Sequence, residues 1–335
     1  MMIRKFLALA LGMALLGGAL AAGALFYYAR SPLPIKTDAL QFSLASGSSL
    51  KSAARQMSEA GVLDHPQLFV LLGRIFGHAG RIKAGSYEFE AGLTHYALLQ
   101  KITRGDVTLM SITFPEGTTF KQMRALLDGH PKLKHESAML DDAQILEHLS
   151  IDGSAPEGWF FPETYYFSER TSDMVILRRA HQLMKRQLDA YWKGRAPDLP
   201  LKDPYEALIL ASIVEKETGR SEDRPLVAAV FLNRLRKGML LQADPTVIYG
   251  LGETFDGNLR KRDLLADTPY NTYTRGGLPP TPIAMPGSAS LEAVLNPPES
   301  DVLYFVSRGD GSSHFSRTLG EHDRAVTKYQ RAGKR

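Results

Sequence analysis

The stretch Ala207-Leu-Ile-Leu-Ala-Ser-Ile-Val-Glu-Lys-Glu-Thr218 is almost entirely apolar up to Val214 and then carries two glutamates. Ahead of it, Asp203 is a good N-cap, Pro204 suits the first helical position and Glu206 completes a capping box, so we expect a helix to begin here. Because this helix is apolar on nearly every face, it should be surrounded by protein. The sequence therefore predicts a buried helix with a carboxyl group near its end.

Glu215 is the candidate catalytic residue of this helix. Burial disfavours the charged form of a carboxyl group, and a carboxylic acid that stays protonated near pH 7 can act as a general acid. At about 100° per residue, Glu217 points roughly 200° away from Glu215, so the two cannot serve one site from the same face. We interpret Glu217 as a structural neighbour. The alternative for Glu215 is a structural ion pair with a basic residue such as Arg234 or Lys216, and the helix pattern alone leaves both open.

Length and composition describe an ordinary globular protein. The chain has 335 residues, enough for two domains, with 44% hydrophobic and 23% charged residues. The net charge of +4 is spread along the chain and gives no reason to expect nucleic acid as a partner. The absence of cysteine excludes disulfides and thiol chemistry, and it fits an extracytoplasmic protein.

The N-terminus predicts a membrane anchor. Residues Phe6 to Tyr28 contain no charge, a length that can cross a bilayer as a helix. The apolar core of a cleaved signal peptide is usually shorter, about 7–15 residues, which favours an uncleaved single-pass span. Residues 1–5 would then be a cytoplasmic tail and 29–39 a linker, with everything beyond on one side of the membrane.

A faint repeat organises the next segment. Three stretches each read as a strand end, a turn at glycine and a helix capped by Ser or Thr: Leu44–Leu50, Phe89–Thr94 and Phe114–Phe120. These small modules, over residues 40–129, resemble LysM modules, which bind glycan; a purely structural role is the alternative. Residues 130–145 read as a connection, and 146–335 as a mixed α+β domain with a helical core. The predicted fold class is thus α+β.

Two loop segments after the core helix carry the candidate substrate-binding groups. They span Leu241–Tyr249 and Tyr270–Pro286 and combine polar side chains, aromatic rings and rigid proline-rich backbone. The polar groups that we expect around a sugar are Gln242, Asp244, Thr246, Asn271 and Tyr273. Each has a local alternative: Asp244 as a helix cap, Asn271 in an Asx-turn and Tyr273 in the core.

Other chemistry has little support. No P-loop, GxGxxG fingerprint or GxSxG elbow is present, so nucleotide chemistry and serine hydrolysis are not expected. His314 and the pair Glu321-His322 lack the spacing of metal ligands. We predict neither a metal nor a cofactor.

Several motifs in sequence order carry a family resemblance. After the span come Phe160-Phe-Pro-Glu-Thr-Tyr165, Ala211–Thr218, Phe231-Leu-Asn-Arg-Leu235, Leu241–Tyr249, Tyr270-Asn-Thr-Tyr273, Gly277-Leu-Pro-Pro280 and His314-Phe315. This set resembles the endolytic murein transglycosylases of the MltG (YceG-like) type, over about residues 158–326. The resemblance implies a bacterial inner-membrane enzyme with a periplasmic catalytic domain, which cuts nascent peptidoglycan strands internally and would end their elongation, with peptidoglycan synthases as candidate partners.

The resemblance puts the family's catalytic glutamate on Glu215 and adds Glu163 to the substrate-binding candidates. As sole acid and base, Glu215 would protonate the glycosidic oxygen after N-acetylmuramic acid and then accept the proton of that sugar's C6 hydroxyl, leaving a 1,6-anhydro end. Gln242 and Asn271 would orient the acetamide. One alternative is a muramidase-type hydrolase with Glu163 or Asp244 as second carboxyl. Another is a non-catalytic membrane scaffold that binds glycan.

Overall fold

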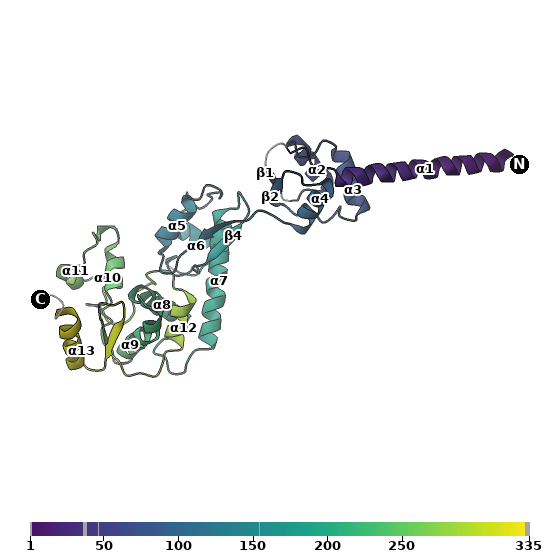
Figure 1. Ribbon diagram of the computed structural model, residues 1–335. Coiled ribbons are helices and arrows are strands. Elements are labelled where there is room, and N and C mark those ends of the chain that lie inside the picture. The colour runs from purple at the N-terminus through teal and green to yellow at the C-terminus, as the bar shows by residue number, and fades with distance from the viewer. Residues whose placement is uncertain (1, 36–38, 46, 154, 332–335) are drawn as a thin grey trace. The chain divides into compact units, whose positions relative to one another are not determined.

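The chain is an α+β protein in which helices dominate and the strands form small two-stranded sheets (Figure 1). The computed structural model describes residues 2–35, 39–45, 47–153 and 155–331. Two compact units divide it. Unit 1 comprises Met1–Ser111 with Tyr166–Arg170, and unit 2 comprises Ile112–Tyr165 with Thr171–Arg335.

Unit 1 begins with helix α1 (Met2–Arg30). Within α1, the 20 residues Leu11–Arg30 are long and apolar enough to cross a membrane. The last turn of α1 is part of the core of the unit, because Tyr28 and Ala29 are buried there. The chain beyond α1 also packs onto the unit, with Leu33 buried and its N–H donating to Leu93 O at 2.8 Å. The predicted linker 29–39 is therefore built into unit 1 over its described residues; residues 36–38 lie outside them.

The rest of unit 1 packs helices against one two-stranded sheet, whose strands are connected by α2 and α3. Strands β1 (Ala39–Leu44) and β2 (Gly85–Glu90) pair antiparallel, with Leu44 opposite Gly85. Helices α2 (Leu50–Glu59), α3 (Pro66–Ile75) and α4 (His95–Arg104) complete the unit. Its core contains Met57, Phe69, Leu72, Tyr87, Phe89 and Leu98.

The three predicted turns are confirmed as local structure. Gly47, Gly92 and Gly117 all have positive φ, a conformation that glycine adopts without strain. Ser49, Thr94 and Thr119 then cap α2, α4 and α5 (Phe120–Asp128) through side-chain oxygens. The third turn, however, lies in unit 2, because the boundary between the units falls at residue 111. The three repeats do not form one compact body.

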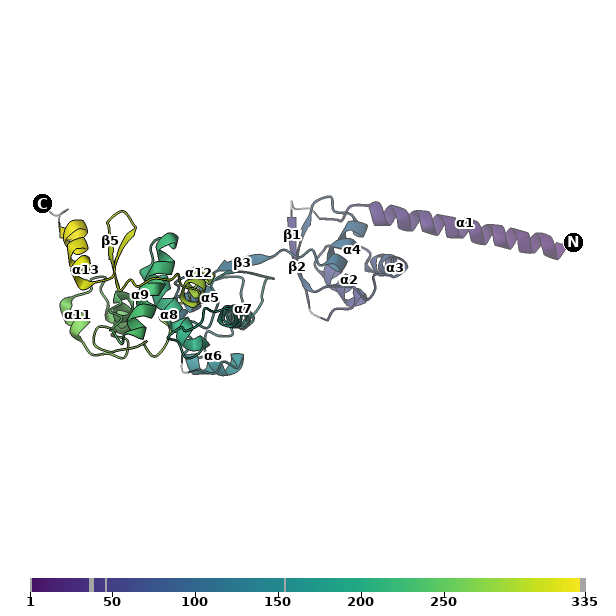
Figure 2. The ribbon, with the colours of Figure 1, turned by 90° about the horizontal axis from the view of Figure 1, so that it is seen from below.

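Unit 2 is mainly helical (Figure 2). The chain passes between the units through β3 (Met110–Thr113) and β4 (Thr164–Phe167), which pair with each other. The remaining elements are α6 (Asp142–Leu149), α7 (Asp173–Lys193), α8 (Pro204–Glu217), η1 (Ser221–Asp223), α9 (Arg224–Arg236), α10 (Asp244–Leu251), η2 (Gly252–Thr254), α11 (Lys261–Leu265), α12 (Ser288–Leu295), β5 (Tyr304–Ser307), β6 (Ser313–Ser316), α13 (Leu319–Val326) and η3 (Thr327–Arg331).

The predicted core helix is confirmed as α8. Every residue from Ala207 to Val214 is buried, and α7, α9, α10 and α12 pack against it. Asp203 caps its start by accepting the Glu206 N–H at 2.9 Å. The capping box is only half formed, because the Glu206 carboxylate accepts from Lys202 N–H instead of Asp203 N–H. After Val214 the last turn of α8 is less buried, so the side chains of Glu215, Lys216 and Glu217 can contact groups outside the core.

Candidate active site

Glu215 lies near the end of α8, against the N-terminus of α12. Its Oε2 accepts hydrogen bonds from the Gly287 N–H at 2.9 Å and from the Ser290 hydroxyl at 2.8 Å. Its Oε1 lies 3.3 Å from Nη2 of Arg224, and the side chains of Arg224 and Glu215 are 13% and 6% exposed. The Glu215 carboxyl group is therefore held by a guanidinium and by two groups at the start of α12.

This arrangement is a structural ion pair, but with a partner that the sequence did not suggest. The cation is Arg224, whereas the prediction named Arg234 or Lys216. Lys216 follows Glu215 directly, so it points about 100° away around the helix, and its ammonium donates to the Gly117 carbonyl at 3.2 Å. Arg234 donates to two backbone carbonyls, each at 2.8 Å.

A second carboxyl group lies beside Glu215. The Glu116 carboxyl occupies the space that a Cβ atom of residue 287 would need, which the glycine there leaves free. Partial burial raises the pKa of Glu116, the negative charge of Glu215 adds to the shift, and Arg224 opposes it. Sequence reasoning missed Glu116, whose only signal is its position in the glycine turn before α5.

Glu217, the second glutamate of the stretch, lines a polar cavity of about 390 Å³. The wall comes from α8, α9, α10, β5 and α13 and from loops at Gln242 and Tyr273. The lining residues of the described chain include Glu217 but not Glu215. The two glutamates therefore face different parts of unit 2, as their roughly 200° separation on α8 requires.

The cavity perturbs Glu217. Burial, followed by the negative charge of Asp244, raises the pKa of Glu217 to about 7, while the Asp244 N–H and Arg234 oppose the shift. Asp244 is exposed and lies in the first turn of α10, where the helix N-terminus stabilises a negative charge. Its carboxylate also accepts the Tyr273 hydroxyl. Glu217, with its raised pKa, can supply a proton, and Asp244 places a second carboxyl group beside it.

Of the predicted substrate-binding residues, Gln242, Asp244 and Tyr273 line this cavity. Ala243, not Asp244, is the N-cap residue of α10. The side chain of Asp244 lines the cavity instead. Gln242 adopts a positive φ of 50°, and its N–H donates to Thr272 O at 3.0 Å. Loops far apart in the sequence thus bring three of the six candidates to one site.

The other three candidates have different surroundings. Thr246 is buried, and its hydroxyl donates to Ala243 O at 2.7 Å. Asn271 is buried as well; its amide donates to Ala266 O at 2.6 Å and accepts the Tyr273 N–H at 2.9 Å, which is the Asx-turn alternative. Glu163 is exposed and accepts the N–H of the next residue at 2.9 Å. Thr246 and Asn271 therefore hold the loops that carry Asp244 and Tyr273.

Two further cavity residues were considered in the sequence only for other roles. Arg234, a buried cation of α9, lies close enough to oppose the pKa shift of Glu217. His322 of α13 stacks on Tyr304 with ring centroids 5.2 Å apart, and burial lowers its pKa. Its Nδ1 is buried without a hydrogen-bond partner among the described residues. The imidazole ring thus contributes to the wall of the cavity.

One group of acidic and histidine side chains in the described chain is close enough to hold a metal: Asp128, His135 and Asp173. The Asp173 carboxylate already accepts hydrogen bonds from the Ser137 N–H at 3.1 Å and the Ser137 hydroxyl at 2.6 Å. Hydrogen bonds from the protein therefore occupy its lone pairs. This cluster stabilises the start of α7 and lies apart from the residues that line the Glu217 cavity.

Fold and site together define a class: an α+β protein with an N-terminal apolar helix and a helical-core domain that places the carboxyl groups of Glu217 and Asp244 at one polar cavity. The chain belongs to the YceG-like family, whose sequence profile matches residues 42–328. The endolytic murein transglycosylase of Bacillus subtilis is 33% identical over 330 residues, covering 92% of this chain and 90% of that protein.

Two other proteins extend the comparison. The endolytic murein transglycosylase of Streptococcus pneumoniae is 28% identical over 350 residues, covering 92% of this chain and 63% of that protein. The crystal structure of a yceG-like protein from Listeria monocytogenes has a TM-score of 0.54 and 29% identity, covering 86% of this chain and 98% of that one.

Proposed function

We propose that this chain is a membrane-anchored lytic transglycosylase that cuts peptidoglycan glycan strands internally. Its relatives from two organisms are named endolytic murein transglycosylases. The observation that carries the proposal on this chain's own residues is the cavity in which Glu217 faces Asp244. A polar cavity with one acid and one carboxylate suits a substrate that is uncharged around the scissile bond and needs a proton on its leaving oxygen.

In this proposal Glu217, not Glu215, is the general acid. A pKa of about 7 leaves Glu217 protonated in a large fraction of molecules at neutral pH. Glu215 does not line this cavity within the described chain, and three donors, one of them cationic, hold its carboxylate against α12 and Arg224. Glu215, the candidate from the sequence, remains the alternative that the experiment below must test.

The reaction needs no water. As the bond between C1 of N-acetylmuramic acid and the bridging oxygen breaks, Glu217 gives its proton to that oxygen, and the next sugar leaves with a hydroxyl group. The C6 hydroxyl of the muramic acid then attacks C1 and returns its proton to Glu217. The Asp244 carboxylate, which accepts the Tyr273 hydroxyl, would stabilise the positive charge on the ring between these steps. The product carries a 1,6-anhydro end.

A muramidase-type hydrolase is the second candidate. The observation that supports it is the presence of a second carboxyl group, Asp244, beside Glu217. A hydrolase uses two carboxyl groups, one as acid and one as base or nucleophile, and Asp244 would be the second. Glu163 is a weaker choice for that role because it does not line the cavity within the described chain. The products separate the two reactions, since hydrolysis leaves a reducing end.

The site of action follows from the anchor. We infer that α1 is retained as a single span, because Tyr28 and Ala29 belong to the core of unit 1 and a cleaved signal peptide would remove them. Unit 2 then lies in the periplasm with the nascent strands, residues 1–5 in the cytoplasm, and peptidoglycan synthases as candidate partners whose strands this cut would end. The LysM-like modules of residues 40–129 would bind glycan, and residues 146–335 would form the catalytic domain.

Matched glutamine variants test the proposal. We expect Glu217→Gln to abolish cleavage of isolated peptidoglycan, while Glu163→Gln, a control with an exposed carboxyl, cleaves normally. Mass spectrometry should find anhydromuramyl ends in the wild-type products and none with Glu217→Gln. If Glu215→Gln is folded but inactive and Glu217→Gln is active, the catalytic acid is Glu215. Reducing ends from the wild type would indicate the hydrolase, and unchanged cleavage in both variants would exclude either glutamate as the acid.

A further inference from the structure

Helix α3 carries an exposed apolar stripe. Leu68, Leu71 and Ile75 are 39%, 45% and 61% exposed, and Phe76, which follows the helix, is 49% exposed. The spacing of these residues puts them on one face of the helix, while Phe69 and Leu72 on another face enter the core of unit 1. A helix that is apolar on its solvent side as well as its core side has a further apolar surface to meet.

The end of the membrane span lies beside this helix. Tyr28, in the last turn of α1, donates its hydroxyl to the carbonyl of His65 at 3.2 Å, and His65 is the N-cap residue of α3. The 20 residues Leu11–Arg30 measure about 30 Å as a helix, the thickness of a bilayer's hydrocarbon core. The start of α3 is therefore level with the membrane surface, and Figure 1 draws α3 beside the end of α1.

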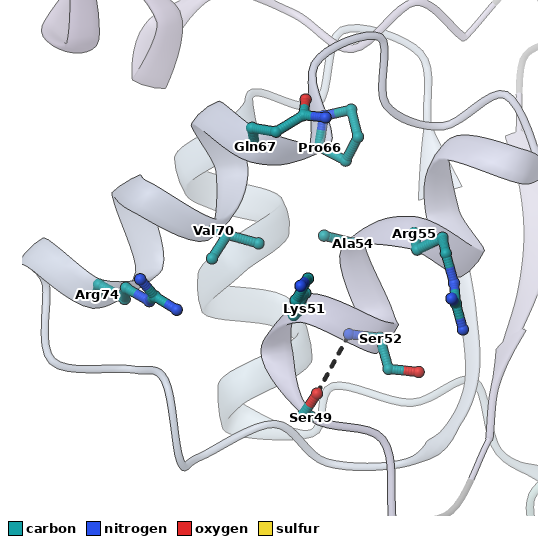
Figure 3. A pocket seen from close by; sticks show the side chains of 9 residues that line it. All are labelled: Ser49, Lys51, Ser52, Ala54, Arg55, Pro66, Gln67, Val70 and Arg74. Atoms are coloured by element: carbon teal, nitrogen blue, oxygen red, sulfur yellow. Dashed lines mark hydrogen bonds between the residues drawn. The ribbon is translucent and has the colours of Figure 1, made fainter.

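A basic groove adjoins the apolar stripe. It measures about 670 Å³ and lies between α2 and α3, where Lys51, Arg55 and Arg74 line it with Ser49, Ser52 and Gln67 (Figure 3). Arg55 lies 3.8 Å from Glu59, an exposed pair that contributes little. No ion pair holds Lys51 or Arg74 within the described part of the chain. Both cations are free to meet an anion from outside.

The groove and the stripe share one helix. Gln67, Val70 and Arg74 line the groove. Each is followed directly by a residue of the stripe: Leu68, Leu71 and Ile75. One residue turns the helix by about 100°, so the two surfaces are neighbouring faces of α3. This order, cations beside an apolar face, is that of a helix lying in a membrane interface.

We propose that α3 lies in the outer surface of the membrane that α1 crosses, with its apolar stripe among the acyl chains and the Lys51–Arg74 groove on phosphate headgroups of anionic lipid. The proposal rests on the retained span proposed above and not on the cleavage reaction. It gives unit 1 two points of attachment, α1 and α3, and so a fixed face toward the bilayer.

Lipid-attached quenchers test the apolar stripe. The chain has no cysteine, so full-length Leu71→Cys can carry one environment-sensitive fluorophore. In vesicles of phosphatidylethanolamine and phosphatidylglycerol with spin-labelled acyl chains, we expect it to lose about half of its emission, as for a helix in the interface. Leu109→Cys is the matched control, an apolar residue of the same unit that is 53% exposed and follows the end of α4 away from the Tyr28–His95 contact.

Two outcomes would overturn the proposal, and they are distinct. Leu16→Cys, in α1, reports whether the span is inserted. If the label at Leu16 is quenched, and the label at Leu71 is quenched no more than the label at Leu109, then α1 is inserted but α3 does not lie in the membrane. Loss of quenching at Leu16 would remove the anchor itself, and the proposal with it. Circular dichroism checks that each labelled variant is folded.

Charge reversal tests the groove. In the Leu71→Cys background, Lys51→Glu with Arg74→Glu should remove the increase in quenching that phosphatidylglycerol causes over phosphatidylcholine alone. Arg104→Glu, at the far end of α4, should leave that increase unchanged. If the double variant responds to phosphatidylglycerol as the wild type does, headgroups do not bind in this groove. A response lost equally in Arg104→Glu would mean that general charge, not the groove, attracts the lipid.

Discussion

Glu215 and Glu217 are two residues apart on α8, and they face different parts of unit 2. Glu215 meets the N-terminus of α12, Arg224 and the Ser290 hydroxyl. Glu217 meets a cavity, with the Asp244 carboxylate as its nearest charge of like sign. Three donors hold the first carboxyl group, whereas burial and the charge of Asp244 raise the pKa of the second. Burial alone therefore does not identify an acid; the groups that share the burial decide.

The largest expected effect separates the two residues by activity. Glu217→Gln removes the proton donor, and a general acid contributes about 10²- to 10⁴-fold in rate. We expect a loss of that size in anhydromuramyl ends released per minute, with the melting temperature unchanged or raised. A Glu217→Gln protein that cleaves at the wild-type rate would reverse the comparison.

The next effect separates them by stability. Glu215→Gln leaves the buried Arg224 guanidinium without its carboxylate, and breaking a buried pair costs about 3–5 kcal/mol. We expect thermal unfolding of unit 2 at a clearly lower temperature, with cleavage retained where the protein is folded. Adding Arg224→Gln should recover part of the loss, because no charge is then buried alone. Equal stability of the wild type and Glu215→Gln would contradict the structural role.

The pH dependence sharpens the comparison. Glu217 has a folded-state pKa of about 7, above its ordinary value of 4.5. The folded state binds its proton more tightly, so this group makes stability fall as pH rises from about 4.5 to 7 and adds nothing further above that. The acid form is the active one, so cleavage should decline through about pH 7. Glu217→Gln should remove its share of the stability slope, measured by melting at pH 5 to 8; Glu157, whose pKa burial also raises to about 7, keeps its own share.

A smaller effect tests Asp244, the charged neighbour of Glu217. Asp244→Asn removes the negative charge beside Glu217, which should lower the pKa of Glu217 and move the decline in cleavage to a lower pH. A pH–rate profile measures it. An unmoved decline would mean that another group sets it.

The smallest effect is expected at Gly287→Ala. Its φ of −82° suits alanine, so the new methyl group displaces only the flexible Glu116 carboxyl. With Glu217 as the acid, the rate of cleavage should change by no more than about 2-fold, since a surface adjustment away from the site costs little. If Gly287→Ala lowers the rate of cleavage as much as Glu217→Gln does, the reaction takes place at Glu215 and Glu116 instead.

The sequence was sufficient for α8 and for the turns, because both depend on local chemistry. A capped start and an unbroken apolar run predicted a buried helix, and glycine before a Ser or Thr cap predicted three turns that the structure contains. The burial of Glu215 followed from the same run. Its partner did not, because Arg224 reaches it through the fold of η1 and α9, which no spacing along the chain indicates.

The cavity was only partly predictable. Gln242, Asp244 and Tyr273 were found because polar groups in rigid loops indicate a site. Thr246 and Asn271 have the same residue chemistry, and only the fold turns their side chains to backbone groups. Glu217 was set aside because helix geometry separates it from Glu215. That geometry was right, but which of the two faces meets β5 and α13 depends on residues about a hundred positions later.

The buried end of α1 ties this helix to the folding of unit 1. Tyr28 and Ala29 fill the core of unit 1, and the Tyr28 ring lies 4.0 Å from the His95 ring, so this core is complete only when the last turn of the span is helical. A shortened, water-soluble form that begins after Arg30 would lose these contacts and leave a gap beside α3 and α4. The last turn of α1 is thus a structural part of unit 1, whatever the rest of the helix contacts.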